Sequence, residues 1–355
     1  MSDGTQANRS RRWAHLFTVV RYVLLAVVVV FAVLFFARQW SQITEVIAGI
    51  PVGAGVASAA VMLLGMGANV LAWVTLLNGL GHVVPFARGA QIMLVGQLGK
   101  YVPGSVWGYV MQMELGRQYG IARARVLVTT LSAAGIGVIA SLLLGVSVVP
   151  AISAEHPQLV WLYVALPVGL VCLHPRVMTW LTNLVLRLFR RPALEHRVTF
   201  VTILTAVGWQ LLSYVLYGVH LQLLVGDAAP VSLLTIIQLG AALSLGFTAS
   251  LIAFVLPSGA GIREAVVIAV LLTLTVPLAD ASAVALVSRA MFTAGDLLLA
   301  GLAVAVVLVM RRRLRARDAA TSEYAALGDW HSGDAADAAS AAPADDAGSA
   351  AKTRS

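Results

Sequence analysis

Long apolar runs separated by short polar segments dominate the pattern of hydrophobic and polar positions along this chain. A run of about 20 apolar residues can cross a hydrocarbon core of about 30 Å as a helix. Runs near that length lie at residues 18–37, 53–80, 123–149, 158–173, 198–224, 231–256, 262–278 and 283–309, the fourth and seventh being short. The pattern therefore predicts an all-α, polytopic integral membrane protein with about eight transmembrane helices.

Proline, glycine and charge break the apolar pattern at two places. The first break reads LGKYVPGSVW over residues 98–107, and the second reads LPSGAGIRE over residues 256–264. Because a bilayer offers no water to a broken backbone, non-helical chain at that depth must be buried in protein or line a polar cavity. Paired interruptions in the two halves of a membrane protein indicate a transport site. We therefore place the functional site at these two breaks.

The segment at about 86–119 predicts a re-entrant hairpin. It begins and ends beside arginines that belong to the same, cytoplasmic side of the membrane. Its apolar stretches, 90–98 and 102–115, are each shorter than a full span. Pro103 suits the first turn of the second half-helix, since its missing N–H would be unpaired there in any case. Aligning Pro103 with Pro257 predicts an inverted internal repeat, with two independent loops as the alternative.

Charge is scarce and unevenly placed. Hydrophobic residues make up 59% of the 355 residues and charged ones 11%, far below the roughly 25% charged residues of a soluble domain. Arginines fall on one side of the predicted spans, Arg263 included, and only Arg38 falls on the other. By the positive-inside rule both termini are cytoplasmic. The basic surplus is thus explained by membrane orientation, and we expect no nucleic-acid partner.

The same pattern divides the chain into three parts. Residues 1–17 form a basic cytoplasmic N-terminus, and residues 18–312 form the transmembrane helical domain. Residues 313–355 end in a stretch rich in Ala, Asp, Ser and Gly, a composition that predicts a disordered cytoplasmic tail. Charge counting also places both breaks near the cytoplasmic boundary.

Three cations near the breaks are candidates for binding an anion. Lys100 and Arg263 adjoin the breaks, where half-helix N–H groups carry partial positive charge, and Arg289 lies seven residues before Asp296 on one face of the last span. A phosphate-bearing headgroup would be attracted to such a place. The alternatives are structural: Arg263 as a surface anchor, and Arg289 paired with Asp296 or Glu264.

The candidate residues form two sets. The expected substrate-binding residues are Lys100, Pro103, Gly104, Pro257, Gly259, Gly261, Arg263, Glu264 and Arg289. The expected cavity-lining residues are Trp107, Gln210, Tyr214, Tyr217 and Asp296. Gln210, Tyr214 and Tyr217 belong to a polar stripe that continues to His220, and such a stripe more often joins helices than binds a ligand.

Signatures of enzymes and cofactors are missing from the sequence. No His/Cys cluster has metal-ligand spacing, no phosphate-binding loop of the G-x-x-x-x-G-K-[ST] type occurs, and the carboxylates within the spans are isolated. We therefore expect no catalytic residues, no metal and no cofactor. An integral-membrane transferase using Glu264 or Asp296 as a base is the weaker alternative.

At its two breaks the chain resembles the lysylphosphatidylglycerol synthase transmembrane-domain family, over roughly residues 18–312. In the multiple peptide resistance factor, a domain like this is linked to flipping an aminoacylated phospholipid, and a separate soluble domain attaches the amino acid. The resemblance implies that both breaks are functional elements. It does not imply lysyl transfer, because only a short polar tail follows Arg317.

These observations predict a bacterial inner-membrane protein that binds and flips an anionic or amphiphilic lipid, such as a phospholipid or a polyprenyl-phosphate carrier. The alternative is a membrane scaffold that recruits a cytoplasmic lipid or glycan transferase through its basic loops and acidic tail. The expected partners are a membrane lipid and, in the second reading, that transferase.

Overall fold

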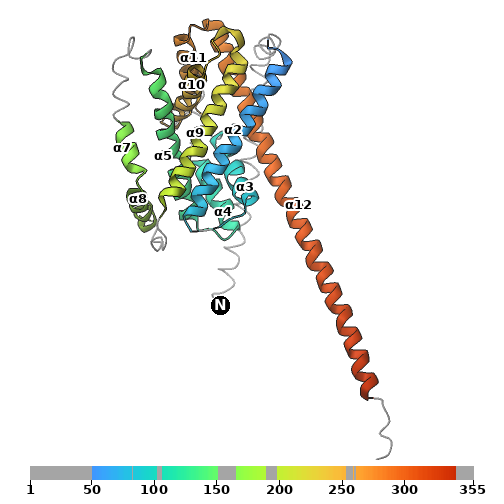
Figure 1. Ribbon diagram of the computed structural model, residues 1–355. Coiled ribbons are helices and arrows are strands. Elements are labelled where there is room, and N and C mark those ends of the chain that lie inside the picture. The colour runs from blue at the N-terminus through green and yellow to red at the C-terminus, as the bar shows by residue number, and fades with distance from the viewer. Residues whose placement is uncertain are drawn as a thin grey trace, which may run out of the picture. The chain divides into compact units, whose positions relative to one another are not determined.

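In the computed structural model, the structure describes residues 50–81, 83–101, 106–150, 165–188, 198–252, 259 and 261–340 (Figure 1). All secondary structure in these ranges is helical, which confirms the predicted all-α fold. The chain divides into a large unit, Met1–Val304, and a small unit, Ala305–Ser355. The predicted first span, residues 18–37, lies outside the described residues.

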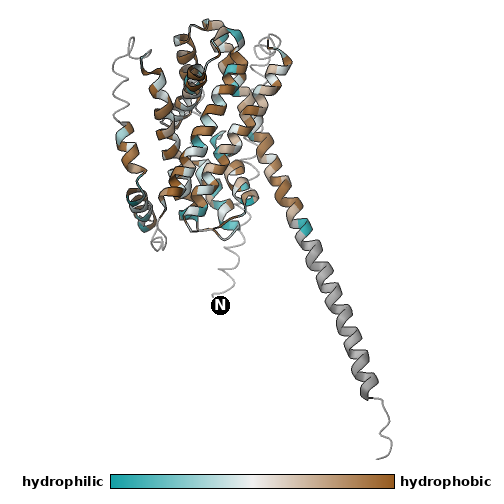
Figure 2. Ribbon diagram, in the orientation of Figure 1, coloured by the Kyte–Doolittle hydropathy of each residue, from teal (hydrophilic) through white to brown (hydrophobic). Residues whose placement is uncertain are grey.

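Five of the predicted spans appear as long apolar helices. They are α2 (Val52–Gly79), α5 (Arg123–Gly145), α9 (Phe200–Val225), α10 (Leu233–Ile252) and α12 (Leu278–Ser340). The stretches long and apolar enough to cross a membrane are Val52–Gly79, Arg123–Val148, Phe200–Ala228, Leu233–Leu251 and Leu278–Met310. Hydrophobic residues predominate along these stretches (Figure 2), as expected of helices that face lipid on one side and protein on the other.

The predicted seventh span, residues 262–278, is wrong as a full crossing. The structure has instead α11 (Ile262–Thr273), a helix of 12 residues. At 1.5 Å per residue it is about 18 Å long, well short of a hydrocarbon core of about 30 Å. The chain turns after it at Thr275, whose φ is 62°, and Pro277 prevents the helix from continuing into α12.

The fourth predicted span is described only in part. Within residues 158–173 the structure has α7 (Ala165–Cys172), and α8 (Pro175–Leu188) follows it. In the tail, composition predicted disorder from residue 313, whereas α12 continues as helix to Ser340. Alanine, the strongest helix former, recurs throughout this stretch. Residues 341–355 lie outside the described residues.

The predicted re-entrant segment is a pair of short helices. It comprises α3 (Phe86–Gln97), the 3₁₀ turn η1 (Leu98–Tyr101) and α4 (Trp107–Gln118), and both α-helices have 12 residues. Gly99 lies so close to the backbone of Gly108 that any side chain would collide with it. The two helices therefore pack back on each other, as a hairpin too short to span the membrane must.

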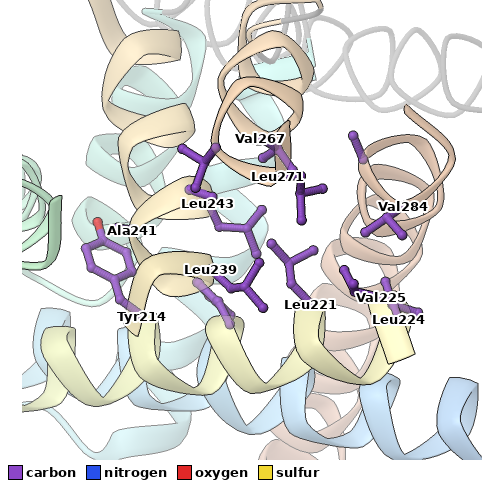
Figure 3. Packing of buried hydrophobic residues seen from close by; sticks show 14 of the residues in the cluster. Tyr214, Leu221, Leu224, Val225, Leu239, Ala241, Leu243, Val267, Leu271 and Val284 are labelled. Atoms are coloured by element: carbon purple, nitrogen blue, oxygen red, sulfur yellow. The ribbon is translucent and has the colours of Figure 1, made fainter. Parts of the chain in front are cut away.

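A hydrophobic cluster packs α9, α10, α11 and α12 together. Leu221 of α9, Leu239 and Leu243 of α10, and Leu271 of α11 are all fully buried and pack together beside α12 (Figure 3). Ser58 of α2 and Ser288 of α12 bond to opposite ring nitrogens of His220, at 2.6 Å and 3.0 Å. His220 thus joins three helices, as expected of the packing role for this end of the polar stripe.

The two broken segments enter the large unit from opposite ends. Figure 1 shows α3 and α4 at the lower end of the bundle and α11 at the upper end. A 12-residue helix follows each break, α4 in one case and α11 in the other. This is the arrangement that an inverted repeat requires; the repeat itself stays a prediction.

Candidate functional site

A cavity of about 330 Å³ lies between the two broken segments. Residues of α2, α3, α4, α5, α9, α10, α11 and α12 contribute to its wall. Its ionisable wall residues with charge at neutral pH are Lys100, Arg263 and Asp296. The cavity is therefore a largely apolar space in which three charged groups converge, the form expected of a specific ligand site.

An ion pair fastens the tip of the first hairpin to α12. Lys100 Nζ lies 2.6 Å from Asp296 Oδ2, and the Tyr101 hydroxyl donates to the same oxygen at 2.6 Å. Asp296 is 3% exposed, so its charge depends on these two donors for compensation. Lys100 is partly exposed and lines the cavity. Lys100, which we predicted to bind a lipid headgroup, is thus already paired with Asp296.

A second ion pair fastens the start of α11 to the same helix. Glu264 accepts a hydrogen bond from Arg289 Nη1, and its other oxygen accepts from the backbone N–H of Gly261 at 2.7 Å. The carboxylate therefore caps the N-terminus of α11 while compensating a buried arginine. Of the two sequence interpretations of Arg289, the structural pair with Glu264 is the one found.

Arg289 and Asp296 lie in the middle third of the candidate span Leu278–Met310. Each therefore anchors one broken segment to the central part of α12, two helical turns apart. Charge counting had put both breaks near the cytoplasmic boundary. That depth stays a prediction, while within the protein the arginine of the second break, Arg263, is only 7% exposed.

Arg263 lies between two aromatic rings. Its guanidinium carbon is 4.3 Å from the ring centroid of Phe247 on α10 and 4.3 Å from that of Phe292 on α12. The two ring centroids are only 5.5 Å apart and the rings meet edge to face, so they form a corner against the guanidinium and leave its N–H groups for hydrogen bonds. The edge atom Nη2 is buried and has no hydrogen-bond partner among the described residues. The alternative of a surface anchor is wrong.

The glycines of the second break give the chain its turn. Gly259 and Gly261 have φ values of 64° and 88°, which favour glycine. Gly259 packs against Ser250 with no room for a side chain and also lines the cavity. Pro103, Gly104 and Pro257 lie outside the described residues.

The cavity-lining predictions divide. Gln210, Tyr214 and Tyr217 of α9 do line the cavity, together with Asp296. Trp107 packs against the hydrophobic cluster around α3 and α4, and its neighbours Gly108 and Tyr109 line the cavity in its place. A helix exposes only part of its circumference to one space, which explains why the stripe splits between cavity and core.

Sequence analysis missed a polar part of the wall. Asn69 of α2, Gln97 of α3, Gln112 of α4 and Thr130 of α5 all line the cavity. Thr130 donates to Gln112 and accepts from the indole N–H of Trp73 at 3.2 Å. Polar side chains inside apolar runs were the available signal, since burying an amide or hydroxyl without a partner is costly.

The end of α4 and the start of α5 carry a separate charge cluster. Glu114 accepts from Arg117 and Arg123, each at 2.6 Å. Burial raises the pKa of the Glu114 carboxyl, but the two arginines outweigh burial, so the pKa lies below its ordinary value. Neither Glu114 nor Arg117 lines the cavity.

Comparison with known protein families gives one match. Residues 23–300 match the family described as Lysylphosphatidylglycerol synthase TM region, which agrees with the resemblance at the two breaks. No curated protein matches the chain. Among the described residues, no group of three or more His, Cys, Asp or Glu side chains could hold a metal ion.

Proposed function

Because the chain belongs to the family described as Lysylphosphatidylglycerol synthase TM region, we propose that it flips an anionic or amphiphilic lipid between leaflets. The family and the helical architecture support a membrane protein that handles lipid. Binding of a headgroup in the cavity and its transfer across the membrane are the finer steps that we add. We propose a bacterial inner-membrane location with both termini cytoplasmic.

One observation carries the proposal: a buried arginine with an unpartnered guanidinium nitrogen lines a cavity between two broken helices. Arg263 lies in that wall with Nη2 unpartnered among the described residues. A cation of this kind attracts a phosphate oxygen strongly, because little water competes for it. The mostly apolar remainder of the wall suits the glycerol backbone and the first acyl carbons.

The two ion pairs suggest how access could alternate. Lys100–Asp296 fastens one hairpin to α12, and Glu264–Arg289 fastens the other. Because the hairpins enter from opposite ends of the bundle (Figure 1), release of either would open the cavity toward one leaflet. Rocking of one half against the other is the usual form of such a cycle.

The same pairs disfavour the transferase alternative. Asp296 accepts from Lys100 and Tyr101, and Glu264 accepts from Arg289 and Gly261. A general base needs a carboxylate that can reach a substrate proton. Both carboxylates are instead occupied in holding the hairpins, and we propose that the protein moves its ligand without a covalent step.

A leaflet-resolved assay tests this function. Vesicles with and without the purified protein would carry fluorescent phosphatidylglycerol, and a membrane-impermeant reductant would report the outer-leaflet fraction with time. We expect faster exchange with the wild-type protein and with Arg176→Gln, an exposed arginine of α8. Arg263→Gln should fall to the protein-free rate. Equal rates with and without wild-type protein, for several anionic lipids at verified incorporation, would refute flipping.

A further inference from the structure

Five charged side chains lie in or near the cavity wall: four form two ion pairs, and the fifth is a single arginine. Lys100 is paired with Asp296, and Arg289 is paired with Glu264. The fifth group, Arg263, makes no ion pair among the described residues, and its Nη2 has no hydrogen-bond partner there. The described part of the site therefore carries one uncompensated positive charge.

The residues of the two breaks that lie outside the described ranges carry no charge of their own. Residues 102–105 read VPGS, residues 253–258 read AFVLPS and residue 260 is alanine. None of these side chains ionises at neutral pH. Whatever positions they take, they bring no charge to the cavity.

The surroundings of Arg263 fix where a ligand charge must sit. Phe247 and Phe292 contact the guanidinium from ring faces, both at 4.3 Å, and Gly246 admits the Arg263 stem close to α10. The arginine is therefore packed along its stem by Gly246 and at its guanidinium by the two rings. Only an acceptor approaching its edge from the cavity can complete its hydrogen bonds.

Resting on the proposed lipid function, we infer that the site selects a headgroup with a single negative charge, that of a phosphodiester, bound at the edge of Arg263. One negative charge neutralises the cavity. A second charge, as on a phosphomonoester or a pyrophosphate, would be buried without compensation, which is strongly unfavourable. A headgroup ammonium would also be buried without a counter-charge, because Asp296 and Glu264 are already paired.

The charges in the cavity wall also bear on whether the headgroup is aminoacylated. A headgroup carrying an added cationic amino acid would need a free carboxylate in the wall. The described wall has one carboxylate, Asp296, and it is held by Lys100 and Tyr101. The geometry therefore favours a simple phosphodiester lipid over an aminoacylated one.

Native mass spectrometry with lipids of identical acyl chains tests the selection. The probes are phosphatidylglycerol, phosphatidate and phosphatidylethanolamine at pH 8, where the phosphomonoester carries close to two charges because its second pKa is about 6. A fourth probe, soluble glycerophosphoglycerol, separates a lipid site from a site for a free phosphodiester. We expect phosphatidylglycerol to bind about tenfold more tightly than each of the others, a difference of about one decade in Kd.

Two variants shift the charge of the site in opposite directions. Arg263→Gln removes the uncompensated positive charge and should abolish the preference for phosphatidylglycerol. Asp296→Asn frees Lys100 and raises the uncompensated charge to two, so phosphatidate should gain at least about tenfold relative to phosphatidylglycerol. Arg176→Gln, on exposed α8 surface, should behave as wild type.

The outcomes separate the two claims. If no lipid binds, the proposed lipid function fails and this inference fails with it. If lipids bind but phosphatidate or phosphatidylethanolamine equals phosphatidylglycerol, or Arg263→Gln keeps the preference, only the single-charge inference is overturned. Equal binding of soluble glycerophosphoglycerol would overturn the lipid part and keep the charge part.

Discussion

At the scale of single residues, the site depends on which charges are compensated. Lys100, Arg263, Glu264, Arg289 and Asp296 were all recognisable in the sequence as costly groups inside apolar runs. Their pairing was not, because Lys100 meets Asp296 across 196 positions of chain and only packing brings the two together. The surface-anchor alternative for Arg263 could not be excluded from the sequence, because its aromatic partners come from two other helices.

The first prediction concerns the Lys100–Asp296 pair. Lys100→Met leaves the Asp296 carboxylate buried with only Tyr101 to donate, so we expect a loss of about 2–3 kcal/mol in the free energy of unfolding, below the full value for a buried pair because Lys100 is partly exposed. Lys100→Met with Asp296→Asn should recover most of that loss. Denaturant titration in detergent measures all three variants.

The control for this cycle is Asp296→Asn alone, which leaves a lysine that can still reach water. It should cost less than Lys100→Met. If the double variant is as unstable as Lys100→Met, the two side chains are not coupled and the ion pair does not hold the hairpin.

At the scale of elements, the length of each apolar segment determines whether it forms a full span or a short helix. The pattern located the five long helices and the short hairpin, because both follow from apolar length and from charge at the ends. It misjudged α11 because apolar residues continue past Thr273 and the turn at Thr275 has a threonine where glycine is the usual signal. Backbone conformation at one residue, and not hydrophobicity, ends that helix.

A second prediction concerns the start of α11. Glu264→Gln removes the charge that caps Gly261 and pairs with Arg289. We expect faster hydrogen exchange at residues 262–266, with α9 unchanged, since loss of a cap costs about 1 kcal/mol and loss of the pair adds to it. The matched control is Asp280→Asn, an exposed carboxylate in the first turn of α12. Equal effects in both variants would contradict the role of Glu264.

A third prediction uses two glycines of α9. Gly218 lies against the backbone of Ile236 and Gly240 on α10, whereas Gly208 has nothing near it. Gly218→Ala should destabilise the protein by about 1–3 kcal/mol through overpacking. Gly208→Ala should instead stabilise it slightly, because alanine is the better helix former. Opposite signs in thermal unfolding would support this close α9–α10 contact, and equal signs would contradict it.

At the scale of the whole molecule, the sequence predicted the membrane class and located the two breaks, but not how the broken segments meet. Pro103 and Pro257, one in each break, are 154 positions apart in the chain, and ion pairs join both broken segments to the middle of α12. Long-range convergence of this kind depends on helix packing, which apolar periodicity does not encode. The cavity wall from α2 and α5 was missed for the same reason.

A fourth prediction fixes the orientation. In a Cys172→Ser background, Asp227→Cys lies in the turn between α9 and α10, and Gln118→Cys lies at the end of α4. With cytoplasmic termini, a membrane-impermeant maleimide should label position 227 in intact spheroplasts and position 118 only after permeabilisation. The reverse pattern would overturn the positive-inside assignment.

The most direct test of the central claim is a cryo-EM map of the protein in nanodiscs containing phosphatidylglycerol. The account predicts headgroup density in the cavity between the two hairpins, with a phosphate oxygen in hydrogen-bond contact with the edge of Arg263 and with Phe247 and Phe292 still against the guanidinium. A lipid-free cavity in such a map, with Arg263 bonded to protein groups and lipid ordered only on the outer surface, would contradict it.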